Sequence, residues 1–222
     1  MTSEVLVLFS KHPNRQKVKT RIGERMGAEF AKRLSLASIK DIVEEMKKLK
    51  GKDVYFVVDT DEERQMFRED TGLDSLVFDF NGFKGFSEKF NKVFGELLGT
   101  RGYKKAVLIP TDILFLNSKD AYLTFRILSN FGCVFGPEEN GGVYLIGLRA
   151  PFPQHIFREV RWSTEYSFLD LLRNSNGDSY TLRVLRDLNT PEDVLDLAPR
   201  IPYNYRNLTK FLSEELSSQL LK

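Results

Sequence analysis

Residues 6–23 read LVLFSKHPNRQKVKTRIG, and the change of pattern after Phe9 is the first indication of the fold. The apolar run that ends at Phe9 is continuous, as expected of a strand covered on both faces. The five cations that follow, before the first acid at Glu24, are Lys11, Arg15, Lys17, Lys19 and Arg21. Because the net charge of the whole chain is only +2, this positive charge is local. A concentrated local field of this kind suits a small anionic ligand.

The length and composition indicate a folded protein with one sizeable core, or a core with a small appendage. The chain has 222 residues, of which 41% are hydrophobic, and this excludes a disordered composition. Its apolar runs are shorter than the roughly 20 residues of a membrane helix, so we expect no membrane association. The start, MTSEVLVLF, has no basic region before its apolar run, and we expect a cytoplasmic location. The single cysteine, Cys133, excludes an intrachain disulfide.

Strand and helix patterns alternate along the chain. Strands are predicted at 5–9, 53–59, 75–80, 105–112, 133–137, 142–148 and 181–185. Helices are predicted at 27–49, 61–69, 87–98, 118–130, 164–173 and after Thr190. The predicted N-caps are Ser87 and Thr190, the latter with Pro191 in the first turn and Asp193 in a capping-box position. This order predicts an α/β fold with helices on both faces of a mostly parallel sheet, and the adjacent strands 133–137 and 142–148 predict a mixed edge.

The end of the chain carries a helical pattern of its own. Residues 198–222 are predicted to form a helical extension of a domain that spans residues 1–197. The apolar residues on one face of this helix are Leu208, Phe211, Leu212, Leu216 and Leu220. This face either packs on the domain, which is the commoner use of such a face, or forms a homodimer contact.

Polar side chains follow the predicted strands, at the sheet edge where open α/β folds bind ligands. The basic loop follows the first strand, Asp112 follows the strand that begins at 105, and the sequences PEENGG and RDLNTPED follow the last strands. Clustered Lys and Arg residues can hold a diphosphate or a triphosphate. Asp112 can hold Mg²⁺, with Asn189 or Asp187 as a second oxygen ligand. Together these groups would neutralise charge on a phosphoryl oxygen or on leaving pyrophosphate.

Each of these features also has a structural interpretation. The basic run can be a solvated surface, Asp112 a loop residue, and Asp187 and Asn189 turn formers before a capped helix. The pair Gly141 and Gly142 is typical of a hairpin turn. Trp162, in RWSTEY, is either a core anchor or a surface on which a base stacks.

Several classes of site are disfavoured by the sequence. His12 and His155 have no partner at a metal-ligand spacing, so neither receives a role. The sequence contains neither Gly-x-Gly-x-x-Gly nor a Walker-type phosphate loop, which disfavours Rossmann dehydrogenases and P-loop ATPases. No aromatic residues alternate with the cations as in single-strand binders, so we expect no nucleic acid partner.

A set of motifs, in order, resembles a known family. These motifs are KHPNRQKVKTRIG, GYKKAVLIPTDILFL, FGPEENGGVYLIGL, RWST and LRDLNTPEDV. The series, over about residues 4–197, resembles the GT-A-like transferases described as radical-SAM/selenodomain-associated transferase 1. These are relatives of the nucleotide-diphospho-sugar transferase superfamily, which includes phospholactate guanylyltransferase and molybdenum cofactor guanylyltransferase. The resemblance implies a GT-A-type three-layer α/β/α sandwich that binds a nucleotide with Mg²⁺ or Mn²⁺.

The resemblance also implies roles for individual residues. The implied phosphate-binding residues are Ser10, Lys11, Lys19 and Arg21, and the implied catalytic residues are Lys19, Arg21 and Asp112. Asp112 matches the metal-binding Asp of the family, and Asn189 matches the second metal contact, with Asp187 beside it. The implied acceptor-side residues are Asn140, Gly141, Gly142 and Trp162.

The sequence departs from the family pattern at four places. Gln16 stands where the family usually has Gly, and Leu114 stands where it has Pro. FSEK, at 86–89, stands in place of Leu-Gly-Glu-Arg, and Asn140 stands in place of Asp. Because the acid is missing at Asn140, the sequence does not identify the acceptor or a residue that could act as general base.

Three functions remain open at this point. The first is transfer of a nucleotidyl group from a nucleoside triphosphate to a small phosphorylated metabolite, with release of pyrophosphate. The basic loop and Asn189 favour it. The second is glycosyl transfer from a nucleotide sugar to a small-molecule acceptor. The third is nucleotide binding without chemistry, which the departures at Gln16, Leu114 and Asn140 keep open.

Overall fold

The computed structural model describes residues 2–111, 113 and 115–220, with side chains as far as residue 215. The strands are β1 Glu4–Phe9, β2 Asp53–Val58, β3 Ser75–Val77, β4 Lys105–Pro110, β5 Cys133–Pro137, β6 Val143–Arg149 and β7 Ser179–Thr181. The α-helices are α1 Thr20–Met26, α2 Ala28–Met46, α3 Asp61–Thr71, α4 Phe86–Phe94, α5 Ser118–Ile127, α6 Ser167–Asn174, α7 Pro191–Leu197 and α8 Arg206–Leu220. Within the described residues, none of the helices has the length and apolarity needed to cross a membrane.

The strands of the described chain form one mixed sheet in the order β3-β2-β1-β4-β6-β5-β7. Strand β6 is antiparallel to both of its neighbours, and the other paired strands run parallel to one another. The amino end of β6 therefore lies at the same edge as the carboxyl ends of β1, β4 and β5. This places the turn before β6 at the edge where α/β folds bind ligands.

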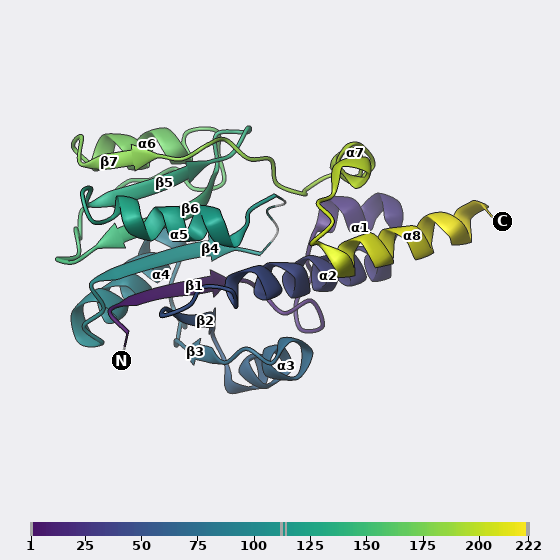
Figure 1. The fold of residues 1–222 in the computed structure, drawn as a ribbon, viewed down its shortest axis with the longest axis horizontal. Helices are drawn as coiled ribbons and strands as arrows, with labels where there is room; N and C mark the ends of the chain where they lie inside the picture. Colours follow the sequence, from purple (N-terminus) through teal and green to yellow (C-terminus); the bar gives the residue numbers. More distant parts are fainter. Residues whose placement is uncertain (1, 112, 114, 221–222) are drawn as a thin grey trace.

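Helices cover both faces of the sheet, so the three-layer α/β/α prediction is confirmed (Figure 1). Alternate residues of β1 point to opposite faces, as strand geometry requires. Leu6 and Leu8 pack with the buried residues of α2, α5 and α8. Val5 and Val7 pack on the other face with those of α4 and α6. The continuous apolar run of the first strand is thus explained by a core on each side.

Several element boundaries differ from the prediction. The helix expected at 27–49 is preceded by α1, which the sequence analysis missed, and Gly27, with φ 95°, separates α1 from α2. The helix expected at 87–98 is α4 followed by a π-helix at Gly95–Thr100. The strand expected at 181–185 is β7, which ends at Thr181, and an isolated bridge joins Leu185 to Glu138.

Of the two predicted N-caps, one is correct. Thr190 accepts a hydrogen bond from the Asp193 backbone in a complete capping box, as predicted. Ser87 does not cap α4, whose N-cap is Gly85. The reason is that the Ser87 hydroxyl donates to the carbonyl of Phe157, 2.8 Å away, on a neighbouring segment.

The carboxyl-terminal helix α8 packs along α2 (Figure 1). The buried Asp41 of α2 accepts hydrogen bonds from the backbone N–H groups of Asn207 and Leu208, at 2.9 and 2.8 Å. Burial raises the pKa of this carboxyl group, which nevertheless supplies acceptors for the first turn of α8.

The apolar face of α8 faces the core of its own chain. Leu208, Phe211 and Leu212 are buried there, as packing on the domain predicts. Leu216 and Leu220 lie outside the described side chains. The segment before α8 also contributes, because the hydroxyl of the buried Tyr205 donates to the Leu116 carbonyl at 2.6 Å. A homodimer contact through this helix stays a prediction.

Candidate functional site

Segments from distant parts of the sequence meet at the carboxyl edge of the sheet. Ser10 follows β1 and Thr111 follows β4, and the Thr111 hydroxyl donates to the Ser10 hydroxyl at 2.7 Å. An antiparallel bridge pairs Ile113 with Asp187. The segment before α7 is therefore placed against the loop that follows β4. Asp112 and Leu114, which the sequence analysis singled out in that loop, lie outside the described residues.

Asp187 connects the two predicted sides of the site. Its carboxylate accepts hydrogen bonds from the side-chain amide of Asn189 and, at 3.5 Å, from that of Asn140. The structure thus brings together two candidate metal ligands and one candidate acceptor residue. Asn140 is exposed, and its own oxygen accepts from the Gly142 backbone at 2.8 Å.

The donor chemistry of this segment suits a hard cation. A carboxylate at Asp187 and a side-chain amide at Asn189 supply oxygen atoms, which Mg²⁺ prefers, and Mg²⁺ usually keeps several waters or substrate oxygens as its other ligands. No group of three His, Cys, Asp or Glu side chains gathers for a metal within residues 2–111, 113 and 115–215. The described donors Asp187 and Asn189 are thus of the chemical type that a hard cation takes.

Lys19 brings positive charge to the same segment. Its side-chain nitrogen donates to the Leu188 carbonyl at 2.5 Å. Leu188 stands between Asp187 and Asn189 in the sequence, so the ammonium group contacts the same short segment as these two residues. Lys19 has φ 44° and ψ 51°, a left-handed conformation that is unusual for a residue with a side chain. The turn before α1 thus directs this partly buried lysine to the segment before α7.

The remaining cations of the basic loop take other directions. Lys11 and Lys17 are exposed, and Arg21 is exposed on the first turn of α1. Arg15 forms an ion pair with Glu62 of α3. Arg15 and Lys17 also line a surface hollow of about 480 Å³ between the loop and the first two helices. The loop is therefore divided, with Lys19 directed to the sheet edge and Arg15 directed to α3.

The basic loop is held in place by His12, to which the sequence analysis gave no role. This residue is buried, and its backbone N–H donates to Glu63 at 2.8 Å. Its ring contacts Asp70 through Nε2 at 3.0 Å and accepts from the Asn14 backbone at Nδ1. The partners in α3 lie more than fifty residues away in sequence, so no local pattern could have revealed this anchor.

The carboxylate beneath the loop has an altered proton affinity. Burial of Glu63, followed by a hydrogen bond and charge repulsion from Asp59, raises the pKa of the Glu63 carboxyl group. A buried carboxyl group thus accepts the hydrogen bond that anchors His12 and the start of the basic loop.

The Gly141–Gly142 turn joins β5 to β6, as its hairpin interpretation predicts. Gly141 has φ 83°, and a Cβ atom there would lie 2.1 Å from the Glu165 carbonyl oxygen. A Cβ atom at Gly142 would lie 2.4 Å from Oε2 of Glu138. Gly141 therefore requires glycine, because its φ is positive and the backbone of a later loop fills the space of a side chain. At Gly142 the close atom is the end of a flexible side chain, which can move aside.

Trp162 lies in that later loop and acts as an anchor. Its indole N–H donates to the Ser87 hydroxyl at 2.7 Å, and its ring packs edge-to-face on Phe86 and Phe90. The ring is partly buried against the core beneath α4. Of the two interpretations that the sequence left open, these contacts favour the core anchor.

Known proteins are similar to this chain over most of its length. Residues 42–164 match the family described as "Uncharacterized protein conserved in bacteria (DUF2064)". A 2-phospho-L-lactate guanylyltransferase of Methanocaldococcus jannaschii is 27% identical over 185 residues, which cover 80% of this chain and 75% of that protein.

Solved structures share the fold. A provisionally assigned nucleotide-diphospho-sugar transferase of Desulfovibrio desulfuricans superimposes with a TM-score of 0.85 at 22% identity, over 98% of this chain and 96% of that one. A 4-diphosphocytidyl-2C-methyl-D-erythritol synthase of Anaerococcus prevotii gives a TM-score of 0.56 at 9% identity, over 87% and 93% of the two chains. The overall fold is therefore common to these proteins.

Proposed function

Because the chain belongs to the DUF2064 family and has the nucleotide-diphospho-sugar transferase fold, we propose that it is a metal-dependent nucleotidyltransferase. Its donor is a nucleoside triphosphate, and its acceptor is a small phosphorylated metabolite. The guanylyltransferase that is its curated relative supports this class of reaction, and so makes GTP and 2-phospho-L-lactate the first substrates to test.

The observation that carries the proposal is the hydrogen bond from Lys19 to the Leu188 carbonyl. It places a cation beside the oxygen donors Asp187 and Asn189, at the sheet edge that ligands use. Both kinds of group are required by a triphosphate, which carries several negative charges and binds as a metal complex.

The proposed reaction exchanges one phosphoanhydride bond for another. A phosphate oxygen of the acceptor attacks the α-phosphorus of the triphosphate, and a new P–O bond forms. The bond between the α-phosphorus and the bridging oxygen breaks, and pyrophosphate leaves with that electron pair. The ammonium group of Lys19 stabilises the charge that develops on the phosphates, and Ser10 offers a hydroxyl at the end of β1.

Asp112 would hold the divalent cation, with Asn189 or Asp187 as the second ligand. The cation would neutralise phosphate charge in the transition state. The turn at Asn140, Gly141 and Gly142, on the other side of Asp187, would receive the acceptor. The hydrogen bond between Asn140 and Asp187 links the acceptor side to the metal side.

The test is a pyrophosphate-release assay with each nucleoside triphosphate, with and without Mg²⁺. GTP with 2-phospho-L-lactate is the first pair, followed by other phosphorylated small acids. Thermal unfolding with each nucleotide runs in parallel, because a ligand that binds the native state alone raises its stability by RT ln(1 + [L]/Kd).

Mg²⁺-dependent pyrophosphate release that requires an acceptor is the expected result. Release of nucleoside diphosphate from a nucleotide sugar would replace the proposal with glycosyl transfer. A Mg²⁺-dependent thermal shift without turnover of any substrate would indicate nucleotide binding without chemistry.

A further inference from the structure

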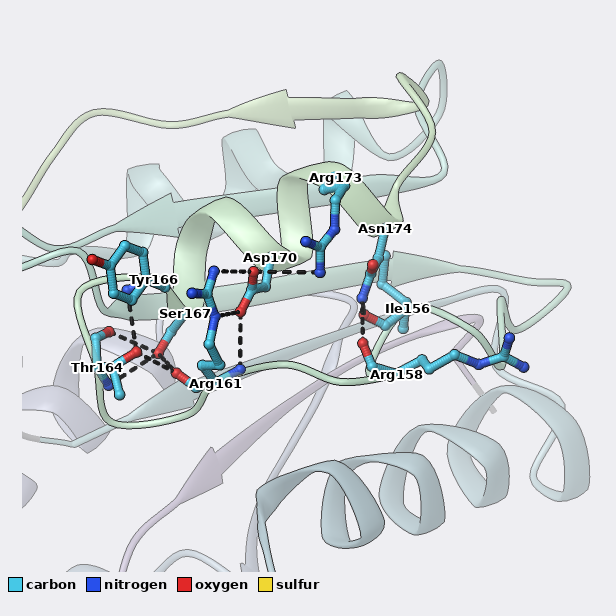
Figure 2. A network of polar contacts seen from close by, with 9 residues as sticks. All are labelled: Ile156, Arg158, Arg161, Thr164, Tyr166, Ser167, Asp170, Arg173 and Asn174. Atoms are coloured by element: carbon cyan, nitrogen blue, oxygen red, sulfur yellow. Dashed lines mark hydrogen bonds and ion pairs between the residues drawn. The ribbon is translucent and has the colours of Figure 1, made fainter.

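A salt bridge outside the proposed catalytic residues holds the loop 161–167 (Figure 2). Arg161 donates to Asp170 of α6 through Nε at 2.9 Å and through Nη2 at 2.8 Å. The backbone N–H of Arg161 donates to the same carboxylate at 3.0 Å. The Asp170 side chain is only 2% exposed, whereas that of Arg161 is 53% exposed. One buried carboxylate thus fixes both the side chain and the backbone at the start of the loop.

The rest of the loop folds back on Arg161. The Arg161 carbonyl oxygen accepts hydrogen bonds from the hydroxyls of Thr164 and Ser167, at 2.7 and 2.8 Å. The Arg161 guanidinium lies over the Tyr166 ring, 4.1 Å from the centroid, on the side opposite to its contact with Asp170 (Figure 2). Displacement of Arg161 would therefore displace the loop as a whole.

The loop is in turn packed against the glycine turn. The Phe168 backbone N–H donates to the Gly141 carbonyl at 3.1 Å. The Glu165 carbonyl oxygen occupies the space where a Cβ atom of Gly141 would lie. On its other side the loop is tied to α4 by the bond from Trp162 to Ser87. The backbone of loop 161–167 is thus one wall of the turn that precedes β6.

The bridge keeps its charge at neutral pH. Hydrogen bonding from Arg161 lowers the pKa of the Asp170 carboxyl to about 2. The carboxylate therefore stays ionised at neutral pH. A planar guanidinium can satisfy both of its oxygens at once, which a lysine ammonium cannot do.

We propose that Arg161 and Asp170 are positioning residues for the acceptor: they hold loop 161–167 against the Gly141–Gly142 turn, and so set the shape of the acceptor side. This inference rests on the proposed nucleotidyl transfer. The acceptor class is the small phosphorylated metabolite of that reaction, which lies against the turn. The nucleotide side, at Lys19 and Leu188, is made by other segments, whereas the hydrogen bonds between Arg161 and Asp170 stay within the loop and α6.

The test compares Arg161→Lys with Arg64→Lys. Arg64 forms a similar two-bond bridge to Asp74, at 3.0 and 3.3 Å, and its side chain is 42% exposed. This pair, whose carboxylate is 48% exposed, lies between α3 and the start of β3, away from the turn. Steady-state rates of pyrophosphate release are measured with GTP and 2-phospho-L-lactate, or with the pair that wild type turns over. Each substrate is varied in turn.

Arg161→Lys should raise the KM for the acceptor roughly tenfold, as expected for the loss of a charge-assisted hydrogen bond. Its kcat and its KM for the nucleotide should stay within about twofold of wild type, and Arg64→Lys should match wild type throughout. Amide hydrogen exchange should become faster in residues 161–168 and 140–143 of Arg161→Lys. A purely structural role would instead change kcat, both KM values and thermal stability together.

Two results would overturn the inference. One is an unchanged KM for the acceptor in an active, folded Arg161→Lys. The other is an equal rise in the KM for the nucleotide. Absence of turnover in the wild type, by contrast, would remove the proposed function itself and the acceptor role with it. Asp170→Asn, which keeps the shape of the side chain, is the second variant, and it should show the same change in KM.

Discussion

Lys19 and Leu188 are 169 positions apart in sequence, yet the lysine ammonium donates to the leucine carbonyl at 2.5 Å. This contact closes the basic loop onto the segment before α7. It brings a cation from the loop after β1 to the segment that carries the Asp187 carboxylate and the Asn189 amide.

Replacement of this lysine should affect nucleotide binding more than folding. Lys19→Met keeps an unbranched side chain and removes the charge. We expect nucleotide affinity to fall about 10- to 100-fold, in line with the loss of charge-assisted phosphate contacts. The measurement is the Mg²⁺-dependent thermal shift with GTP. Lys17→Met, an exposed lysine of the same loop, is the control, and equal losses in both variants would contradict the role of Lys19.

The metal prediction is tested at Asp187. Asp187→Asn removes a negative charge and keeps the shape, so weaker cation binding is expected. The Mg²⁺ concentration that gives half-maximal stabilisation by GTP should rise about tenfold. Asp196→Asn, which removes an exposed carboxylate paired with Arg186, is the control. An unchanged Mg²⁺ requirement in Asp187→Asn would rule out this ligand.

The packing at the glycine turn predicts a stability difference between two glycines. Gly141 and Gly177 both have φ 83°, but a Cβ atom at Gly177 would meet nothing within 4 Å. Gly177→Ala should cost about 1 kcal/mol from backbone strain. Gly141→Ala should cost about 2 kcal/mol more, because its Cβ atom collides with the Glu165 backbone. Urea denaturation of the two variants measures the difference, and equal costs would contradict the packing.

The raised pKa of Glu63 predicts a dependence on pH. Since the folded-state pKa lies above the unfolded value, ionisation is less favourable in the folded state. The wild type therefore loses stability as the pH rises from the unfolded pKa through the folded pKa. Glu63→Gln has no charge to lose, and its amide oxygen can still accept from His12.

Denaturation of this variant should show a gain over wild type at pH 8 that shrinks towards pH 4. Glu62→Gln, an exposed neighbour in the same helix, is the control for the lost charge. A stability difference between Glu63→Gln and wild type that is constant with pH would contradict the prediction.

The sequence predicted the sheet well because buried strands carry continuous apolar runs. The runs at β1, β2 and β4 stand out without any tertiary information, and the capping box at Thr190 is a local pattern with a local cause. The prediction of Ser87 as an N-cap was wrong because its hydroxyl donates to the carbonyl of Phe157, seventy positions later. Local preference yields to tertiary contacts in such cases.

The site was predicted as a set of segments but not as a set of contacts. The rule that ligands bind beyond strand ends located Ser10, Lys19, Gly141 and Asp187 at one edge. The roles of His12 and Asp170 depend on partners in other helices or on burial, and neither leaves a periodic signal in the sequence. The importance of the bridge to Asp170 comes from the packing of loop 161–167 against the turn, which is a tertiary contact.

The docking of α8 has a consequence for the smallest fragment that could fold. Asp41 supplies acceptors to the first turn of this helix, and Tyr205 secures the Leu116 carbonyl in the loop after β4. A fragment cut after Leu197 would remove those donors from Asp41 and would uncover both this carboxyl group and the apolar side of α2. The minimal autonomous unit therefore extends at least through Leu212, because the carboxyl-terminal helix shares one buried core with β1.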